Sequence, residues 1–188
     1  YHGEMHYLER ARERRTTPDS SLAGLKNVIV AALDYNSDQP LSIDVAADPE
    51  KGWISRYAWG DDYHHVIEKM LDAWCRQLSD RWPNNSFRRY VDHGPVLEKA
   101  YARRAGIGWM GKHTNVIHPE RGSWFFLAVI LTDLELSVDA ALPDRCGTCT
   151  ACLDACPTKA FVAPYVLDAT RCISYLTIEL KGEIPEEF

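Results

Sequence analysis

The chain of 188 residues carries a formal net charge of −6, and 46% of its residues are hydrophobic. This hydrophobic fraction is enough for a packed core, and the length allows one substantial domain with a small appendage. The acidic balance argues against an autonomous nucleic-acid binder, because phosphate contacts need clustered Lys and Arg. The sequence has no signal segment and no apolar run that could span a membrane, so we expect no membrane partner.

The first fifty residues predict a helix, a strand and a loop. A charged segment begins at Tyr1 as if already inside a helix, and it ends at a turn over residues 17–19. The β-branched run at 27–33 predicts a buried strand. Residues 36–51 are polar and contain two prolines, which predicts an exposed loop.

A long amphipathic helix is predicted over residues 61–82, with Asp61 or Asp62 as its N-cap. Its apolar positions at helical spacing are Val66, Met70, Leu71, Trp74, Cys75 and Leu78. Because Cys75 is a lone cysteine on this apolar face, we expect it to pack in the core rather than bind a metal.

The middle of the chain predicts two more strands around a helix. Residues 86–92 predict a strand that ends at Asp92, and a helix should begin at Pro95 and end at Gly106 as its C-cap. A glycine-rich turn then leads into a short strand and presents Lys112 and His113, but it lacks a G-x-G-x-x-G after a strand and is a weak phosphate-loop candidate. The segment 122–134 holds eight consecutive apolar residues, which predicts a strand covered on both faces.

Irregularly mixed helices and strands indicate an α+β fold rather than a regular βαβ repeat. Asp92, next to His93 at the end of a predicted strand, has two interpretations. Aspartate is common at helix N-termini, and the residue pattern alone favours a capping role. The alternative is a proton donor held at the end of the strand.

From about Asp144 a cysteine module follows, with Cys146, Cys149, Cys152 and Cys156 within eleven residues and a proline after the last. Disulfides are disfavoured because thiols this dense cannot all bridge without strain. A structural zinc site usually separates its two Cys-x2-Cys pairs by a dozen or more residues. The spacing Cys-x2-Cys-x2-Cys-x3-Cys-Pro is the bacterial ferredoxin run, which predicts [4Fe-4S] clusters. Reduced cysteines in this number indicate the cytoplasm or another reducing compartment.

The ferredoxin run also accounts for Cys172, which lies on a helix predicted from Asp168 to Leu180. In such runs the first three thiolates hold one cluster and the fourth reaches a second. Cys156 and Cys172 would then share the second cluster. Because three ligands are missing from the count, we expect the natural protein to continue past Phe188.

Six segments together closely resemble the epoxyqueuosine reductase family: YHGEM, SRYAWGDDYHHV, VDHGPVLEKAYARRAGIGWMGKHT, GSWFFLAVILTDLEL, CGTCTACLDACPTKAF and LDATRCISYLTIELKGEIPEE. The resemblance implies an oxidoreductase that completes queuosine biosynthesis by reducing epoxyqueuosine at the wobble position of tRNA. It implies cobalamin and two [4Fe-4S] clusters as cofactors. It also implies a nitroreductase-like cobalamin domain at residues 1–143 and a ferredoxin-like module at 144–188, both incomplete here.

Site residues also follow from the resemblance. Asp92 is the proton donor of the V-D-x-x-P motif, although His93 replaces the family's more frequent Ser or Thr. Cys146, Cys149 and Cys152 match ligands of the first cluster, and Cys156 and Cys172 match ligands of the second. Corrinoid contacts are expected from Arg15, Ser55, Asp92, Lys112, His113, Val116, Ser123 and Leu127.

The chemistry that the resemblance implies needs two electrons and two protons for each epoxide. Asp92 would have to be protonated at neutral pH, which calls for a partly dry pocket. The D-x-H-x-x-G signature, by which a histidine reaches cobalt, starts at Asp62 but has isoleucine at position 67. We therefore expect base-off cobalamin with no protein histidine on cobalt. We expect a monomer that receives electrons from an external flavodoxin- or ferredoxin-type donor.

Two rival functions remain at this point. A related corrinoid reductase, similar to the reductive dehalogenases, would act on a small organic substrate. A pure electron-transfer module would need only the ferredoxin run, and it leaves unexplained the long α+β region that precedes the cysteines.

Overall fold

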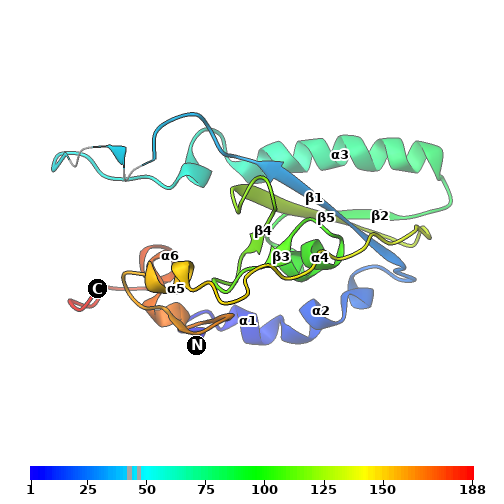
Figure 1. Ribbon diagram of the computed structural model, residues 1–188. Helices are drawn as coiled ribbons and strands as arrows, with labels where there is room; N and C mark the ends of the chain where they lie inside the picture. The colour runs from blue at the N-terminus through cyan, green and yellow to red at the C-terminus, as the bar shows by residue number, and fades with distance from the viewer. Residues whose placement is uncertain (42–43, 46–47) are drawn as a thin grey trace.

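The computed structural model describes residues 1–41, 44–45 and 48–188 and shows a mixed helix and sheet fold (Figure 1). Strand β5 (Phe125–Thr132) lies between β1 (Asn27–Asp34) and β2 (Phe87–Tyr90) in an antiparallel sheet. Helix α3 (Tyr63–Arg81) packs on one face of this sheet, and the shorter α4 (Glu98–Arg104) packs on the other. The expected mixture of helices and strands is confirmed.

The side chains of the central strand β5 are divided between the two faces of the sheet. Ala128 and Ile130 point to a core that they share with Ile67 and Leu71 of α3. Val129 and Leu131 point the other way, into a second core around Val96. Because side chains alternate along a strand, a continuous apolar run is required when both faces are covered. The predicted two-sided burial is confirmed from Ala128 to Thr132, whereas Phe125, Phe126 and Leu127 are half-buried.

Strand β1 forms as predicted, but the expectation that it is buried is wrong. None of its residues is fully buried, and Ala32 is exposed. The reason is that β1 is an edge strand: it pairs with β5 on one side, and no strand covers its other side in the described sheet. Periodicity cannot tell an edge strand from a central one, because the difference lies in which neighbours cover it.

The long helix α3 begins one residue after Asp62, whose carboxylate accepts the backbone N–H of His64 and so acts as the predicted N-cap. Cys75 is half-buried against the α3 core, which confirms its packing role. Met70 and Trp74 are 54% and 47% exposed and border an apolar groove of about 450 Å³ between α3 and β1. The predicted loop at 36–51 has no strand in its described part, and Arg56 fixes it by hydrogen bonds to Asn36 Oδ1, Ser37 O and Gln39 O.

The N-terminal segment differs from the expectation of a helix at Tyr1. Helix α1 (Tyr7–Arg10) starts later and is separated from α2 (Arg12–Thr16) at Ala11. The six residues before α1 instead lie against the C-terminal part of the chain. Ala169 donates its backbone N–H to Tyr1 O at 2.9 Å, and Glu4 N–H donates to the Tyr175 hydroxyl at 3.0 Å. These contacts with tertiary partners determine the conformation, and a helical pattern in the sequence does not reveal them.

Two predicted helix boundaries are also wrong. Helix α4 begins at Glu98 rather than Pro95, with Leu97 in the cap position. The helix expected over residues 168–180 is interrupted at Cys172, which has an extended backbone between the 3-10 turn η4 (Ala169–Arg171) and α6 (Ile173–Ile178). Asp168 caps the 3-10 turn by accepting the Thr170 N–H. Because the helix is interrupted at Cys172, this cysteine lies in the N-cap position of α6.

Short hairpins complete the fold. The glycine-rich turn joins β3 (Trp109–Met110) to β4 (Val116–Ile117), and the cysteine module contains α5 (Ala151–Asp154), β6 (Phe161–Ala163) and β7 (Val166–Leu167). Both chain ends lie beside this module in Figure 1.

Gly108 is required by the close approach of the β4 backbone. A Cβ at this position would collide with the carbonyl of Ile117, which cannot move without breaking the hairpin. We expect Gly108→Ala to lower the free energy of unfolding by about 1–3 kcal/mol, as overpacking does. Gly52→Ala is the matched control, because an added Cβ there meets nothing within 4 Å. Urea unfolding of both variants makes the comparison, and equal stability of the two would contradict the close approach.

Candidate functional site: the Asp92 loop and the cysteine module

Asp92 lies on a tight bend that directly follows the sheet. Val91, 4% exposed, anchors this bend in the α3 core, and the His93 N–H donates to Val91 O at 2.6 Å. Asp92 itself has φ +56°, a left-handed conformation that is uncommon outside glycine and often marks functional positions. Its side chain is 63% exposed. Because α4 starts six residues later, Asp92 cannot be its N-cap, and the capping interpretation is wrong.

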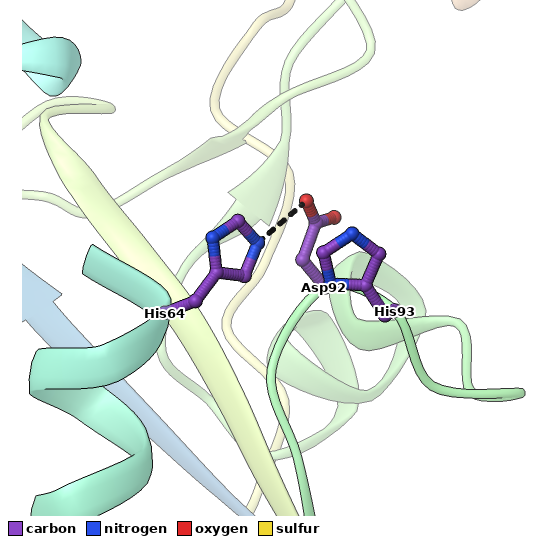
Figure 2. Close-up of side chains that lie close together, drawn as sticks. All are labelled: His64, Asp92 and His93. Atoms are coloured by element: carbon purple, nitrogen blue, oxygen red, sulfur yellow. Dashed lines mark ion pairs between the residues drawn. The ribbon is translucent and has the colours of Figure 1, made fainter. Parts of the chain in front are cut away.

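Two residues at the start of α3 face the Asp92 carboxylate. The Tyr63 hydroxyl donates to Asp92 Oδ2 at 2.9 Å. Burial and this neighbouring carboxylate raise the pKa of Tyr63, so its phenol stays protonated and remains a donor. His64 Nε2 lies 3.6 Å from the same Oδ2 (Figure 2), and His64 Nδ1 donates to Asp62 Oδ1 at 2.8 Å.

The exposed carboxylate contradicts the expectation of a partly dry pocket around Asp92 within this chain. The rings of Tyr63, His64 and His93 cover only part of this carboxylate. Tyr63 and His64 are stacked with ring centres 4.0 Å apart, and His93 is tilted against His64 at 4.6 Å. Tyr63 stacks in turn on Phe126 of β5, at 4.2 Å. This aromatic column fixes the position of the donors, and the carboxylate still faces outward.

A second set of polar groups lies around the first turn of α4. Glu98 is half-buried, and its Oε1 has no hydrogen-bond partner among the described residues. Burial and the negative charge of Asp92 raise the pKa of Glu98 to about 7, although its own backbone N–H opposes the shift. Arg15 Nε, from α2, is also buried without a partner in the described chain. Lys99 Nζ donates to Asn115 Oδ1 at 2.7 Å. Unpaired buried polar atoms are rare in proteins and suggest that a ligand satisfies them.

Four of the residues expected to contact a corrinoid lie in or beside the β3–β4 hairpin. His113 and Val116 belong to it, and the Ser123 hydroxyl donates to Val116 O at 2.7 Å. Burial lowers the pKa of His113, which keeps its ring neutral, and its Nδ1 accepts the Asn115 N–H. The fourth residue, Lys112, lies in the same turn. The structure therefore groups Lys112, His113, Val116 and Ser123.

The other corrinoid candidates come from separate elements. Leu127 is half-buried on β5, Ser55 is exposed at the start of the 3-10 turn η3 (Arg56–Ala58), and Arg15 comes from α2. The tyrosine and histidine of α3, Tyr63 and His64, were not identified as site residues from the sequence, and neither was Glu98. A sequence signal for Tyr63 and His64 does exist: both directly follow the capping Asp62. Side chains in the first turn of a helix can reach the end of a neighbouring strand.

Lys112 joins the hairpin to the cysteine module. It is only 9% exposed, and its Nζ donates to Gly147 O at 2.7 Å and to Cys149 O at 2.8 Å. The backbone of Tyr165 donates to Lys112 O at 2.9 Å. A buried ammonium group needs such acceptors, because an unpaired buried charge is strongly unfavourable. The Lys112 side chain thus holds the loop that carries Cys146 and Cys149.

No disulfide joins the six cysteines, which are all free thiols in the structure. The loop of the first three is further fixed by Asp144, whose carboxylate accepts the Cys146 N–H and the Tyr165 hydroxyl. Cys152 lies on α5. Free thiols on a loop whose backbone is held from outside are a suitable arrangement for metal–thiolate bonds.

Cys156 and Cys172 lie near one another through their flanking residues. A pocket of about 540 Å³ is lined by Pro157–Lys159, which follow Cys156, and by Arg171 and Ile173, which flank Cys172. Arg171 Nε donates to Thr158 O at 3.1 Å. The backbone N–H of Ala160 donates to Cys156 Sγ at 3.3 Å. Although burial opposes it, this bond and those from Thr158 lower the pKa of the Cys156 thiol. The thiolate that a cluster requires is therefore favoured at Cys156.

Comparison with known proteins agrees with this arrangement. Residues 15–93 match the family model described as "Epoxyqueuosine reductase QueG, DUF1730", and residues 145–188 match a "4Fe-4S double cluster binding domain". The epoxyqueuosine reductase of Pseudomonas aeruginosa is 48% identical over 188 residues, which cover 100% of this chain and 52% of that protein. The chain belongs to the epoxyqueuosine reductase family.

Solved structures of epoxyqueuosine reductases have the same fold. One, with an epoxyqueuosine-modified tRNA stem loop, has a TM-score of 0.84 at 38% identity and is matched over 94% of this chain and 46% of its own. Another, from Bacillus subtilis with its catalytic aspartate loop swung out of the active site, has a TM-score of 0.83, 38% identity and the same coverage. The chain thus spans about half the length of the family members that it matches. No helix in its described residues is both long and apolar enough to cross a membrane.

The raised pKa of Glu98 predicts a pH dependence of stability. Between the usual value of 4.5 and about 7, the folded protein binds more protons than the unfolded chain, so the free energy of unfolding should fall as the pH rises through this range. Glu98→Gln removes this loss and should be more stable than the wild type at pH 8 but not at pH 4. Urea unfolding of the corrinoid-free protein at both pH values measures the difference. Glu120→Gln, at an exposed position, is the control, and the same pH profile for both variants would contradict the burial of Glu98.

Proposed function

We propose that this chain forms the cofactor-binding part of an enzyme that reduces epoxyqueuosine to queuosine at the wobble position of tRNA. Residues 1–143 would be a nitroreductase-like cobalamin domain, and residues 144–188 a ferredoxin-like module with ligands of two [4Fe-4S] clusters. The observation that carries the proposal is the link through Lys112, which joins the hairpin of the corrinoid candidates to the cysteine loop. Electron transfer from a cluster to a corrinoid requires such proximity.

The residues present fit a corrinoid. Arg15 Nε and Glu98 Oε1 are buried polar atoms without partners in the described chain, and a corrin with its amide side chains offers both donors and acceptors. Ser55, His113, Val116, Ser123 and Leu127 would provide further contacts. Lys112 would contribute through its backbone, since its ammonium group is already used on two carbonyls. Cobalamin would supply the nucleophilic chemistry at carbon, and we expect it to bind base-off.

The residues present also fit iron–sulfur clusters. All five candidate ligands are free thiols, and Cys156 is held as a favourable thiolate by backbone N–H groups. Cys146, Cys149 and Cys152 would serve the first cluster. Cys156 and Cys172, whose flanking residues line one pocket, would serve the second. Electrons would enter from an external flavodoxin- or ferredoxin-type protein.

Asp92 is the residue that would deliver a proton in this reaction. Opening the epoxide to an alkene consumes two electrons and two protons and releases the oxygen as water. Tyr63 holds Asp92 Oδ2 in place, and His64 lies within 3.6 Å of the same oxygen. The chain alone leaves the carboxyl exposed, so bound corrinoid and substrate would have to exclude water from it before it can act as an uncharged acid.

The substrate would be tRNA, as it is for the relative solved with a modified tRNA stem loop. The net charge of −6 gives this chain few phosphate contacts, so most tRNA affinity would come from regions outside it. One local feature suits an RNA base: Arg56 lies 5.1 Å above the Trp59 ring beside an aromatic pocket of about 520 Å³. We propose that the enzyme acts in the cytoplasm as a monomer. A corrinoid reductase for a small organic substrate is not favoured, because the relatives and solved structures are epoxyqueuosine reductases.

Cluster assignment is tested by iron content. In full-length protein reconstituted under anaerobic conditions, we expect about eight iron atoms per chain, and about four after Cys172→Ser removes a ligand of the second cluster. Cys75→Ser is the control and should retain about eight, because Cys75 packs against α3. Zinc in place of iron, or equal iron loss in both variants, would contradict the assignment.

The role of Asp92 is tested by Asp92→Asn. We expect the full-length enzyme to keep its fold, clusters and corrinoid but to reduce epoxyqueuosine in tRNA roughly 10²–10⁴-fold more slowly, the usual range for loss of a general acid. Single-turnover kinetics measure the rate. Asp61, an exposed residue two positions before α3, provides the control: the Asp61→Asn enzyme should react normally. Since Asp92 caps no helix, an Asp92→Asn enzyme with an unchanged rate would remove it from the mechanism.

A further inference from the structure

Three metal-ligating side chains meet beside the α3 N-terminus. Figure 2 shows His64 reaching from the first turn of α3 toward Asp92 and His93 on the loop after β2. One ring nitrogen from each histidine and one carboxylate oxygen lie within 4.8 Å of one another. Over residues 1–41, 44–45 and 48–188, no other three His, Cys, Asp or Glu side chains come this close.

His64 is oriented by its other ring nitrogen. Because a carboxylate can only accept, the 2.8 Å contact to Asp62 Oδ1 places the proton on Nδ1 and leaves a lone pair at Nε2. That Nε2 is buried and makes no hydrogen bond within the described chain. Histidines that bind metals usually donate their second nitrogen to a carboxylate in this way, which fixes the ring and strengthens the ligand.

We propose that His64, Asp92 and His93 bind one divalent first-row transition metal ion, with Zn²⁺ as the representative case. Two imidazole nitrogens and one carboxylate oxygen form a donor set that such ions accept, with water in the remaining position. Tetrahedral zinc with bonds of about 2.0–2.2 Å separates its ligand atoms by about 3.4 Å. The three side chains must therefore close by at most about 1.4 Å from their 4.8 Å limit. Asp92 and His93 are exposed on a loop and can make this movement.

The consequence for catalysis rests on the proposed function, whereas the site itself does not. A metal bound to the Asp92 carboxylate occupies the oxygen that would deliver a proton to the substrate. Zinc at this site therefore inhibits the reductase, and the metal must leave before turnover.

Zinc binding is measured first, without reference to activity. Isothermal titration calorimetry with Zn²⁺ alone is performed on full-length protein whose cysteines already hold iron–sulfur clusters. We expect one site that weakens at least roughly tenfold in His93→Ser and by roughly 10–100-fold in Asp62→Asn. Asparagine caps a helix about as well as aspartate, so Asp62→Asn leaves α3 intact. His65→Ser, an exposed histidine on the same helical turn, is the control and should bind zinc normally.

The ligands are identified with Co²⁺ in the same protein. Nitrogen and oxygen ligands give weak d–d absorption alone, whereas thiolates add intense charge-transfer bands in the near ultraviolet. Equal zinc affinity in the wild type and His93→Ser, or a thiolate spectrum for the bound cobalt, would overturn the site. Zinc inhibition that is relieved in His93→Ser would support its effect on turnover, and turnover unchanged at saturating zinc would overturn that effect. A protein that binds zinc here but reduces no epoxyqueuosine without zinc would contradict the proposed function and leave the site supported.

Discussion

Burial of strand β5 on both faces is the constraint on which the rest of the structure depends. Its side chains alternate between a core with α3 and a core with α4, so both helices are positioned by the same eight residues. Antiparallel pairing with β2 then fixes where that strand ends, and Val91 anchors the following bend in the α3 core. The Asp92 carboxylate thus meets the first turn of α3 because two elements pack on one strand.

The polar groups of the site differ in how deeply they are buried. Tyr63 and His64 are held by ring stacking and by the Asp62 carboxylate, which makes them fixed partners for a carboxylate on a loop. Glu98 and Arg15 have buried atoms without partners in the described residues. Such atoms lower stability in the free protein, and proteins retain them where a ligand or a reaction requires them. The Asp92 side chain is likewise only partly surrounded by this chain and stays exposed.

Two sets of contacts connect the sheet domain to the cysteine module. Lys112 extends from the β3–β4 hairpin to two carbonyls of the cysteine loop, and the N-terminal residues bind the segment around α6 through Tyr1 O and the Tyr175 hydroxyl. Met5 adds apolar contact with the buried Tyr175 and Leu176. Because these contacts come from two separate segments of the chain, they restrain the position of the module. The proposed transfer of electrons from clusters to a corrinoid would need such a restraint, since electron transfer falls off with distance.

The sequence by itself determined the features that depend on local chemistry. The spacing of the first four cysteines, the apolar run of β5 and the capping Asp62 were all interpretable, because each reflects ligand geometry, strand alternation or a local hydrogen bond. Features that depend on distant partners were decided only by the tertiary structure. The edge position of β1 and the non-helical start at Tyr1 follow from neighbours far along the chain. Asp92 shows the difference most directly. Its sequence context suggests a helix cap. The structure instead shows that α4 starts too late for this and that Tyr63 and His64 contact the Asp92 carboxylate. A local sequence pattern cannot pair Asp92 with side chains 28 and 29 residues away.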